Sequence, residues 1–269
     1  MISVLTIVRN RAGHLAQLVE GLRRSSQPPA ELVVVDMASD TPVEIGDTSF
    51  PVHVKRLATE RLPLAEARNL AARHASSENL LFLDVDCIPM RALIGAIDQA
   101  LEHSDALICA EVLYLGPDDA RGQWDEVDLA SRGKPHPVRD FPAHGLRTEI
   151  NPGLFWSLAF GIRRARFEAL GGFDEAFRGY GGEDTDFGFR ADAAGLPLLF
   201  MGGPGAFHQH HPSPDPPLQH FDDIVRNAQI FRERWGFWPM EGWLRQFEKM
   251  GLLCIEPSAL HVLRRPAGL

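Results

Sequence analysis

Short apolar runs alternate with amphipathic stretches through the first 115 residues of the chain. Ile2–Val8 and Glu31–Asp36 are rich in β-branched residues and predict buried parallel strands, and a weaker run at Val52–Arg56 predicts a third. Between the first two runs, apolar residues follow the spacing of one helix face: Leu15, Leu18, Val19 and Leu22. This succession is typical of the opening of a doubly wound α/β domain.

The same alternation continues toward the end of the chain. It predicts helices at residues 64–74, 91–102 and 163–170, and strands at residues 80–83, 106–113, 158–162 and 198–201. Residues 116–151 show no periodicity, so we expect a long loop there. A last amphipathic helix has apolar residues at helical spacing, which we expect to pack in the core: Phe221, Ile224, Val225, Ala228, Phe231 and Trp235.

The pattern therefore predicts an α/β protein with a mostly parallel central sheet flanked by helices, followed by a C-terminal helical extension. No linker or break in composition divides the chain, so we expect one domain over residues 1–269.

Composition narrows the class of protein. The net charge of -9 provides no basic surface, which argues against nucleic acid as a partner. Three cysteines without a C-x-x-C pair argue against a disulfide framework and favour a reducing compartment. No run approaches the ~20 apolar residues of a membrane span, and the N-terminal apolar run lacks the basic flank of a signal peptide. We expect a cytoplasmic protein, with peripheral attachment to the inner membrane as a variant of that expectation.

Two aspartates follow the apolar run at residues 80–83. Asp84 and Asp86 are spaced i, i+2, so both project to the same side of an extended chain. In an open α/β sheet, ligands bind at the carboxyl ends of strands. Carboxylates there suit Mg²⁺ or Mn²⁺, which leave coordination positions for phosphate oxygens. A strand that merely ends in a polar turn would carry the same two residues.

Further acids and histidines lie in the second half of the chain. Glu183, Asp184 and Asp186 follow a glycine-rich segment and open a predicted helix, where a single acid would suffice to complement the helix dipole. His208 and His210 alternate to one side of an extended segment, an arrangement that suits a metal ion, and His211 follows them. Residues 235–243 are aromatic-rich, and we expect them to pack rather than to line a site.

The chain lacks both G-x-G-x-x-G and the P-loop motif, so neither common nucleotide-binding loop is supported. Its motifs instead resemble those of the GT-A glycosyltransferases of the broad family-two kind, most closely the β-1,4-galactosyltransferase branch. Residues 8–15 (VRNRAGHL) resemble F-R-N-R-x-x-H-L, and residues 84–90 (DVDCIPM) resemble D-V-D-L-I-P-M. Residues 179–186 (GYGGEDTD) resemble G-W-G-G-E-D-D-D, and His208 with residues 221–224 resembles a final H…F-D-x-I.

The resemblance implies a single GT-A domain in which residues 1–115 bind a nucleotide sugar, residues 116–220 hold the acceptor and the catalytic groups, and residues 221–269 form C-terminal helices. It implies Asp184 as catalytic base and Glu183 as a hydrogen-bond partner of a sugar. It implies Asp86 and His208 as metal ligands, with Mn²⁺ or Mg²⁺ as cofactor. The implied nucleotide-sugar contacts are Arg9, Asn10, Arg11, Asp36, Arg68, Asp84, Val85, Asp86, Tyr180 and Gly182.

The chain departs from the branch at three of these positions. Tyr180 replaces a tryptophan and Thr185 an aspartate, and Gly205 stands where the family has a methionine ligand. We therefore expect another group to complete the metal site, and His210 is the candidate.

The expected reaction is transfer of a hexose from a UDP-sugar to a hydroxyl of a saccharide or glycolipid, with inversion. Galactose, N-acetylgalactosamine and glucose all remain open as the donor sugar, and the motifs do not exclude a GDP-sugar. Two other functions stay open: sugar nucleotidyl transfer, and binding of a nucleotide sugar without catalysis. A nucleotidyltransferase would need a Gly-rich loop with Arg or Lys after the first strand, where this chain has only Arg9 and Arg11.

Overall fold

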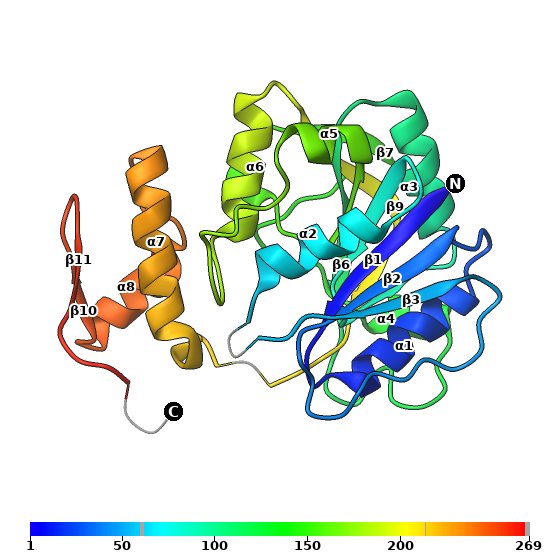
Figure 1. Cartoon of the computed structure of the whole chain (residues 1–269), viewed down its shortest axis with the longest axis horizontal. Helices are drawn as coiled ribbons and strands as arrows, with labels where there is room; N and C mark the ends of the chain where they lie inside the picture. The colour runs from blue at the N-terminus through cyan, green and yellow to red at the C-terminus, as the bar shows by residue number, and fades with distance from the viewer. Residues whose placement is uncertain (60–61, 213, 267–269) are drawn as a thin grey trace.

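A computed structural model describes residues 1–59, 62–212 and 214–266. Its centre is a nine-stranded sheet of order β3-β2-β1-β4-β8-β6-β9-β5, with β7 paired to β9 (Figure 1). The first four strands are parallel neighbours: β1 (Ile2–Val8), β2 (Glu31–Asp36), β3 (Val52–Arg56) and β4 (Asn79–Leu83). Val8 pairs with Asp36, so β1 and β2 end at the same edge of the sheet.

The other half of the sheet mixes strand directions. β6 (Leu107–Tyr114) and β9 (Leu198–His208) are parallel to each other and run the same way as β4. Three strands run the opposite way: β5 (Cys87–Pro89), β7 (Gly145–Glu149) and β8 (Ala159–Arg163). Most strands thus share one direction, which confirms the expected α/β class with a mostly parallel sheet.

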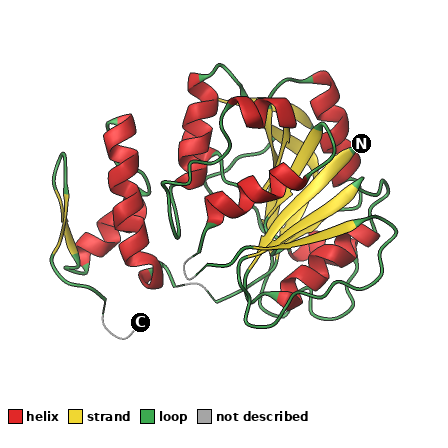
Figure 2. Cartoon of the chain, viewed as in Figure 1, coloured by secondary structure: helices red, strands yellow, loops and turns green. Residues whose placement is uncertain are grey.

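Helices cover both faces of this sheet (Figure 2). α1 (Ala12–Arg23) and α3 (Leu93–His103) bury leucine and isoleucine against one face. α2 (Leu64–His74), α5 (Arg164–Ala169) and α6 (Glu183–Ala193) cover the other face, where phenylalanines form much of the core. Because central strands such as β1 and β2 are buried on both faces, they are continuous apolar runs without alternation.

A smaller C-terminal unit stands beside this body (Figure 1). It consists of α7 (Phe221–Trp235), α8 (Glu241–Lys249) and a hairpin of β10 (Leu253–Ile255) and β11 (Leu260–Val262). Its core includes Phe221, Ile224, Leu244 and Phe247. The predicted apolar core face of α7 is confirmed for four of its six residues, whereas Val225 and Trp235 are only half-buried. The extension also contains a β-hairpin that the sequence pattern did not indicate.

The expectation of a loop over residues 116–151 is wrong in part, because the segment contains α4 (Glu126–Arg132) and β7. Short 3-10 helices lie at Pro152–Leu154 and Leu218–His220. No helix in the described parts of the chain is long and apolar enough to cross a membrane.

β9 is longer than predicted and continues from residue 201 to His208. Gly202 and Gly205 permit close approach of neighbouring backbone in this extension. A Cβ on Gly205 would lie 2.0 Å from the carbonyl oxygen of Glu111, and one on Gly202 would lie 1.7 Å from that of Pro142. This extension brings His208 to the carboxyl edge of the sheet.

Candidate functional site

The site forms where the turn after β4 meets the end of β9. The amide of Cys87 donates to the carbonyl of Asp84 at 2.8 Å, which closes the Asp84–Cys87 turn. Cys87 pairs with His208 across the β5–β9 ladder, and the amide of Gln209 donates to the carbonyl of Asp86 at 2.8 Å. Residues about 120 positions apart in the sequence are therefore held together by backbone hydrogen bonds.

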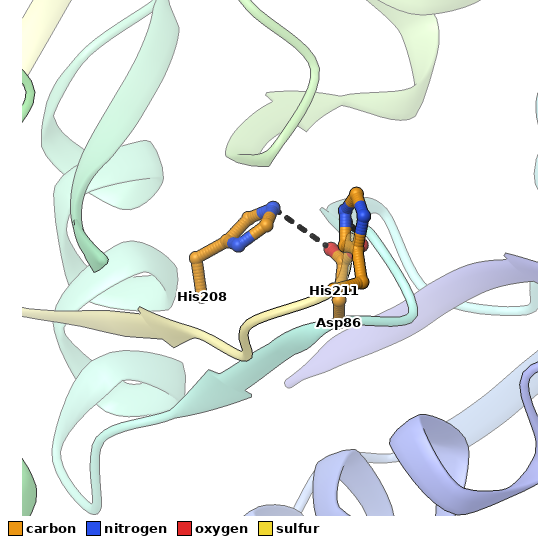
Figure 3. A group of neighbouring side chains, drawn as sticks. All are labelled: Asp86, His208 and His211. Atoms are coloured by element: carbon orange, nitrogen blue, oxygen red, sulfur yellow. Dashed lines mark ion pairs between the residues drawn. The ribbon is translucent and has the colours of Figure 1, made fainter. Parts of the chain in front are cut away.

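Asp86, His208 and His211 converge here (Figure 3), and one ligand atom from each lies within 4.8 Å of the others. His208 Nε2 is 3.5 Å from Asp86 Oδ1, and His211 Nε2 is 3.4 Å from Asp86 Oδ2. One carboxylate and two imidazoles form a donor set that suits a divalent transition-metal ion such as Mn²⁺. The residues present therefore fit the metal that the sequence motifs imply.

Of the two histidines expected to bind the metal, the structure brings only His208 to Asp86. His210 is exposed, and His211 lies beside Asp86 at the position that was predicted for His210. The alternation that favoured His210 holds only while the chain stays extended, and β9 ends at His208. His211 is present in the same sequence motif, but a strand that places His208 and His210 on one side would place His211 on the other.

Asp86 is held as an ionised carboxylate. Burial alone would raise its pKa, but hydrogen bonding from His211 and electrostatic interaction with His208 and Arg11 outweigh burial and lower the pKa to about 2. Arg11 Nη1 lies 2.8 Å from Asp86 Oδ2. Burial lowers the pKa of His208, which favours the neutral imidazole that coordinates metals.

Arg68 of α2 joins two further acids. Arg68 is 5% exposed, and its guanidinium nitrogens lie 3.1 Å from Asp84 Oδ1 and 2.9 Å from Glu183 Oε1. Burial and the nearby Asp184 raise the pKa of Glu183 to about 7, although Arg68 opposes both. Burial likewise raises the pKa of Asp84 to about 6, against the charge of Arg68. One guanidinium thus pairs with two acids, the half-buried Asp84 and the buried Glu183, and the pKa of each lies above its ordinary value.

Asp184 is the second residue of α6 and is half-buried. Burial raises its pKa, while Arg68 and backbone hydrogen bonds from Thr185 and Ser157 act in the opposite direction. The amide of Thr185 donates to Asp184 Oδ1 at 2.7 Å. A fixed carboxylate with a raised pKa is suited to accept a proton from a hydroxyl.

The glycine-rich segment before α6 has positive φ angles, a backbone conformation that glycine adopts more readily than other residues. Gly179, Gly181 and Gly182 have φ of 74°, 91° and 91°, and Gly182 is the residue that precedes the helix. Between them, the ring of Tyr180 stacks on His220 with 4.4 Å between centroids. One face of the aromatic ring expected to meet a sugar is therefore covered by a neighbour.

The remaining nucleotide-site residues lie along the ends of β1, β2 and β4. Asp36 is buried and accepts hydrogen bonds from the Ser39 amide (2.8 Å) and from Arg56 Nη1 (2.9 Å), which braces the loop after β2. Asn10 has a positive φ of 54°, and its side chain pairs with Asp40. Arg9 is half-exposed directly after β1, and Val85 is buried between the two aspartates.

Sequence reasoning missed a row of aromatic rings beside the metal ligands. The ring of Tyr114 stacks on that of His208, with 4.8 Å between the ring centroids. The ring centroid of His136 lies 5.6 Å from that of Tyr114, and Trp156 meets His136 edge-on with 4.7 Å between centroids. Tyr114, His136 and Trp156 are all half-buried. They come from β6 and from two loops without periodicity, so the sequence pattern carried no signal that would join them.

Comparison with known proteins identifies relatives of this chain. A family model described as glycosyl transferase family 2 matches residues 3–171, and one described as the N-terminal domain of galactosyltransferase matches residues 148–211. Validoxylamine A glucosyltransferase of Streptomyces hygroscopicus subsp. jinggangensis is 48% identical over 235 residues, which cover 74% of this chain and 53% of the relative. The enzyme of the same name from subsp. limoneus is 27% identical over 235 residues, with 74% of this chain and 49% of the relative covered. The chain thus spans about half the length of these relatives.

Solved structures share the fold at low sequence identity. S. aureus TarS 1-349 in complex with UDP aligns with a TM-score of 0.60 at 17% identity, covering 93% of this chain and 78% of that one. GalNAc-T7 with UDP, GalNAc and Mn²⁺ aligns with the same score and identity, covering 93% of this chain and 56% of that one. Since the family model spans more than half of the sequence and the fold agrees, the chain belongs to glycosyl transferase family 2.

Proposed function

We propose that this chain transfers a hexose from a UDP-sugar to a hydroxyl of a saccharide or glycolipid acceptor, with inversion and with a divalent metal. One observation supports the proposal above all: Asp84 and Asp86, two residues apart on one turn, link a set of possible metal ligands to a pair of acids that share one arginine. Asp86 meets His208 and His211, and Asp84 shares Arg68 with Glu183. A UDP-sugar needs a cation at its diphosphate and a base at the acceptor, and this arrangement offers both.

The metal would be held by Asp86, His208 and His211. When bound, Mn²⁺ or Mg²⁺ supplies Lewis acidity that neutralises charge on the departing diphosphate, a contribution of several kcal/mol. Arg9 and Arg11 follow the end of β1 and would add positive charge for the same phosphates. Mn²⁺ is the better fit, because imidazole ligands favour it over Mg²⁺.

Asp184 is proposed as the catalytic base. Its carboxylate accepts the proton of the acceptor hydroxyl while that oxygen bonds to the anomeric carbon, and the bond from this carbon to the diphosphate oxygen breaks in the same displacement. Attack opposite the leaving group inverts the anomeric centre. Glu183, fixed by Arg68 through Oε1, has its Oε2 buried without a hydrogen-bond partner among the described residues, and this oxygen is proposed to accept from a sugar hydroxyl.

Glucose is the donor sugar that the curated relatives favour, since the one at 48% identity is named as a glucosyltransferase. Galactose and N-acetylgalactosamine are the next candidates. The motif likeness to the β-1,4-galactosyltransferase branch and the galactosyltransferase model over residues 148–211 support them. Uridine as the base is supported by the structural neighbours solved with UDP.

The acceptor is proposed to bind along Tyr114, His136 and Trp156, which lead away from the metal ligand His208. Trp156 precedes Ser157, whose backbone hydrogen-bonds to Asp184, so this row reaches the proposed base as well. Aromatic faces suit the apolar faces of sugar rings. We expect Trp156→Ala to raise the KM for the acceptor while hydrolysis of the donor in the absence of acceptor stays unchanged, as steady-state kinetics would show.

Nucleotide release from a panel of UDP- and GDP-sugars, with Mn²⁺, Mg²⁺ or a chelator, tests the proposal. Asp86→Ala is expected to abolish metal-dependent release. Asp184→Asn is expected to lower transfer by ~10²–10⁴-fold while UDP still binds in calorimetry. Asp192→Asn, an exposed acid on the same helix, serves as the matched control.

Absence of release from every donor, together with metal-dependent UDP binding, would replace this proposal with a nucleotide-sugar-binding module. Release of a nucleoside triphosphate from a sugar nucleotide and pyrophosphate would instead indicate nucleotidyl transfer.

A further inference from the structure

α7 has one polar residue on its otherwise apolar buried face. Phe221, Ile224, Ala228 and Phe231 are the buried neighbours of Asn227, which has no exposed surface. The side-chain oxygen of Asn227 is buried without a hydrogen-bond partner among the described residues. Burial of an unpaired polar atom costs free energy that an apolar side chain would avoid. The hydrogen bonds of the side-chain nitrogen are what can offset this cost.

That nitrogen faces the glycine-rich segment that leads into α6. Asn227 Nδ2 donates to the carbonyls of Gly181 (2.7 Å) and Arg178 (3.0 Å) and lies 3.4 Å from that of Tyr180. The backbone has positive φ at Gly179 and Gly181. In this conformation the carbonyl oxygens point toward α7 and accept hydrogen bonds from it rather than from a neighbouring strand. One amide group thus fixes the three peptide units that lie just before Glu183 and Asp184.

Neighbouring residues hold the same segment from two sides. A Cβ on Gly179 would lie 1.9 Å from Asp223 Oδ2, so this carboxylate packs directly on the glycine. Arg226 donates to the carbonyl of Arg178 and pairs with Asp223 at 2.9 Å. On the far side, the amide of Gly179 donates to the carbonyl of Leu62 at 2.9 Å.

α7 also holds the chain just after the two acids. Asp186 has no exposed surface and accepts hydrogen bonds from Arg234 Nη1 (2.7 Å) and Trp235 Nε1 (3.0 Å), both on α7. Asn227 and Arg234 are seven residues apart, about two helical turns, so they lie on the same side of α7. Glu183 and Asp184 therefore lie between two anchor points on a single helix, which stands beside α6 in Figure 1.

We propose that Asn227 is a positioning residue: through the carbonyls of residues 178–181 it sets where α6 begins and hence where Asp184 points. Its catalytic consequence rests on the proposed function, whereas its effect on the loop does not. Because a misplacement of about 1 Å in a catalytic group can cost ~10²-fold in rate, loss of these donors should reduce turnover far more than donor binding.

The test compares Asn227→Ala with Phe231→Leu in the full chain. Phe231 lies one turn further along α7, is fully buried and packs on Phe189, but makes none of the loop hydrogen bonds. Hydrogen exchange measured by mass spectrometry over residues 176–186 reports on the loop without any need for activity. Steady-state kinetics report kcat and the KM of the donor separately.

We expect Asn227→Ala to speed exchange over residues 176–186 at least ~10-fold and to lower kcat ~10- to 100-fold, with the KM of the donor within ~3-fold. Phe231→Leu should lower the melting temperature at least as much but leave loop exchange and kcat near wild type. Unchanged loop exchange in Asn227→Ala, or an equal loss of kcat in both variants, would overturn the proposal. If the wild type transfers no sugar, the proposed function fails, and the exchange comparison alone decides whether Asn227 holds the loop.

Discussion

Replacement of Arg68 by methionine would remove the only guanidinium that the described residues place between Asp84 and Glu183. Methionine keeps a long unbranched side chain but removes the charge and the donors that lie 3.1 Å and 2.9 Å from the two carboxylates. Glu183 would then be buried without its cationic partner, and the half-buried Asp84 would lose the same partner. Removal of one partner from a buried ion pair typically costs about 3–5 kcal/mol, so we expect a loss of that size at pH 8.

The cost should depend on pH, and Glu183 gives the sign. Burial raises its pKa from 4.5 to about 7, so between these pH values the folded protein holds a proton that the unfolded chain has lost. Glu183 therefore lowers stability as pH rises through this window, by about 3 kcal/mol at 1.36 kcal/mol per unit, and its contribution is level above pH 7. Without Arg68 the folded pKa rises further, so the loss continues to higher pH.

The destabilisation by Arg68→Met is thus expected to grow with pH, from below about 2 kcal/mol at pH 5 to about 3–5 kcal/mol at pH 8. Urea unfolding, followed by tryptophan fluorescence with chelator present at pH 5, 6.5 and 8, measures it. Arg73→Met on the same helix is the control, because Arg73 is 58% exposed and its partner Glu175 is 4.0 Å away. A destabilisation that is independent of pH, or no larger than that of Arg73→Met, would refute this account of the cluster.

Two further predictions concern the histidine cluster and the glycine-rich segment. His211→Ala is expected to weaken Mn²⁺ binding in calorimetry at least ~10-fold, whereas His210→Ala should leave it within ~2-fold, because His211 lies beside Asp86 and His210 does not belong to the cluster. A larger effect of His210→Ala would contradict the geometry. Gly179→Ala is expected to destabilise the protein by more than about 2 kcal/mol in thermal unfolding, since φ is 74° and the new Cβ would meet a carboxylate at 1.9 Å. Gly13→Ala, in α1 with open space around it, should instead be neutral or stabilising, and a similar loss in both variants would count against the steric argument.

The elements of the first 115 residues could be predicted from the sequence because local pattern determines them. β1, β2, β3 and α2 have the predicted bounds, since each is a run with one periodicity and clear ends. The position of Asp84 and Asp86 at the sheet edge follows from the same pattern, because carboxyl ends of parallel strands share an edge. The short strand β5 directly after them was not predicted, since it forms only by pairing with β9.

Prediction was weaker where elements depend on distant partners. β7 and the second half of β9 contain glycine, charged or exposed residues, and each is a strand because of the strands beside it. α4 lies in a segment without periodicity, and only Leu129 among its residues is buried. Local pattern carries little information about such elements, because their burial is decided elsewhere in the chain.

By itself the sequence determined the α/β class, the edge of the sheet at which chemistry is possible, and most of the groups gathered there. Only the tertiary structure decided that His211 and not His210 meets Asp86, because β9 ends at His208 and its alternation does not extend to His210. Only the tertiary structure buried Glu183 next to Asp184, which moved the pKa of Glu183 toward neutrality, and brought Arg68, 115 positions away, to oppose that shift. The sequence specifies which side chains are present, whereas the geometry of a metal site and the pKa of a buried acid depend on which distant residues the fold brings into contact.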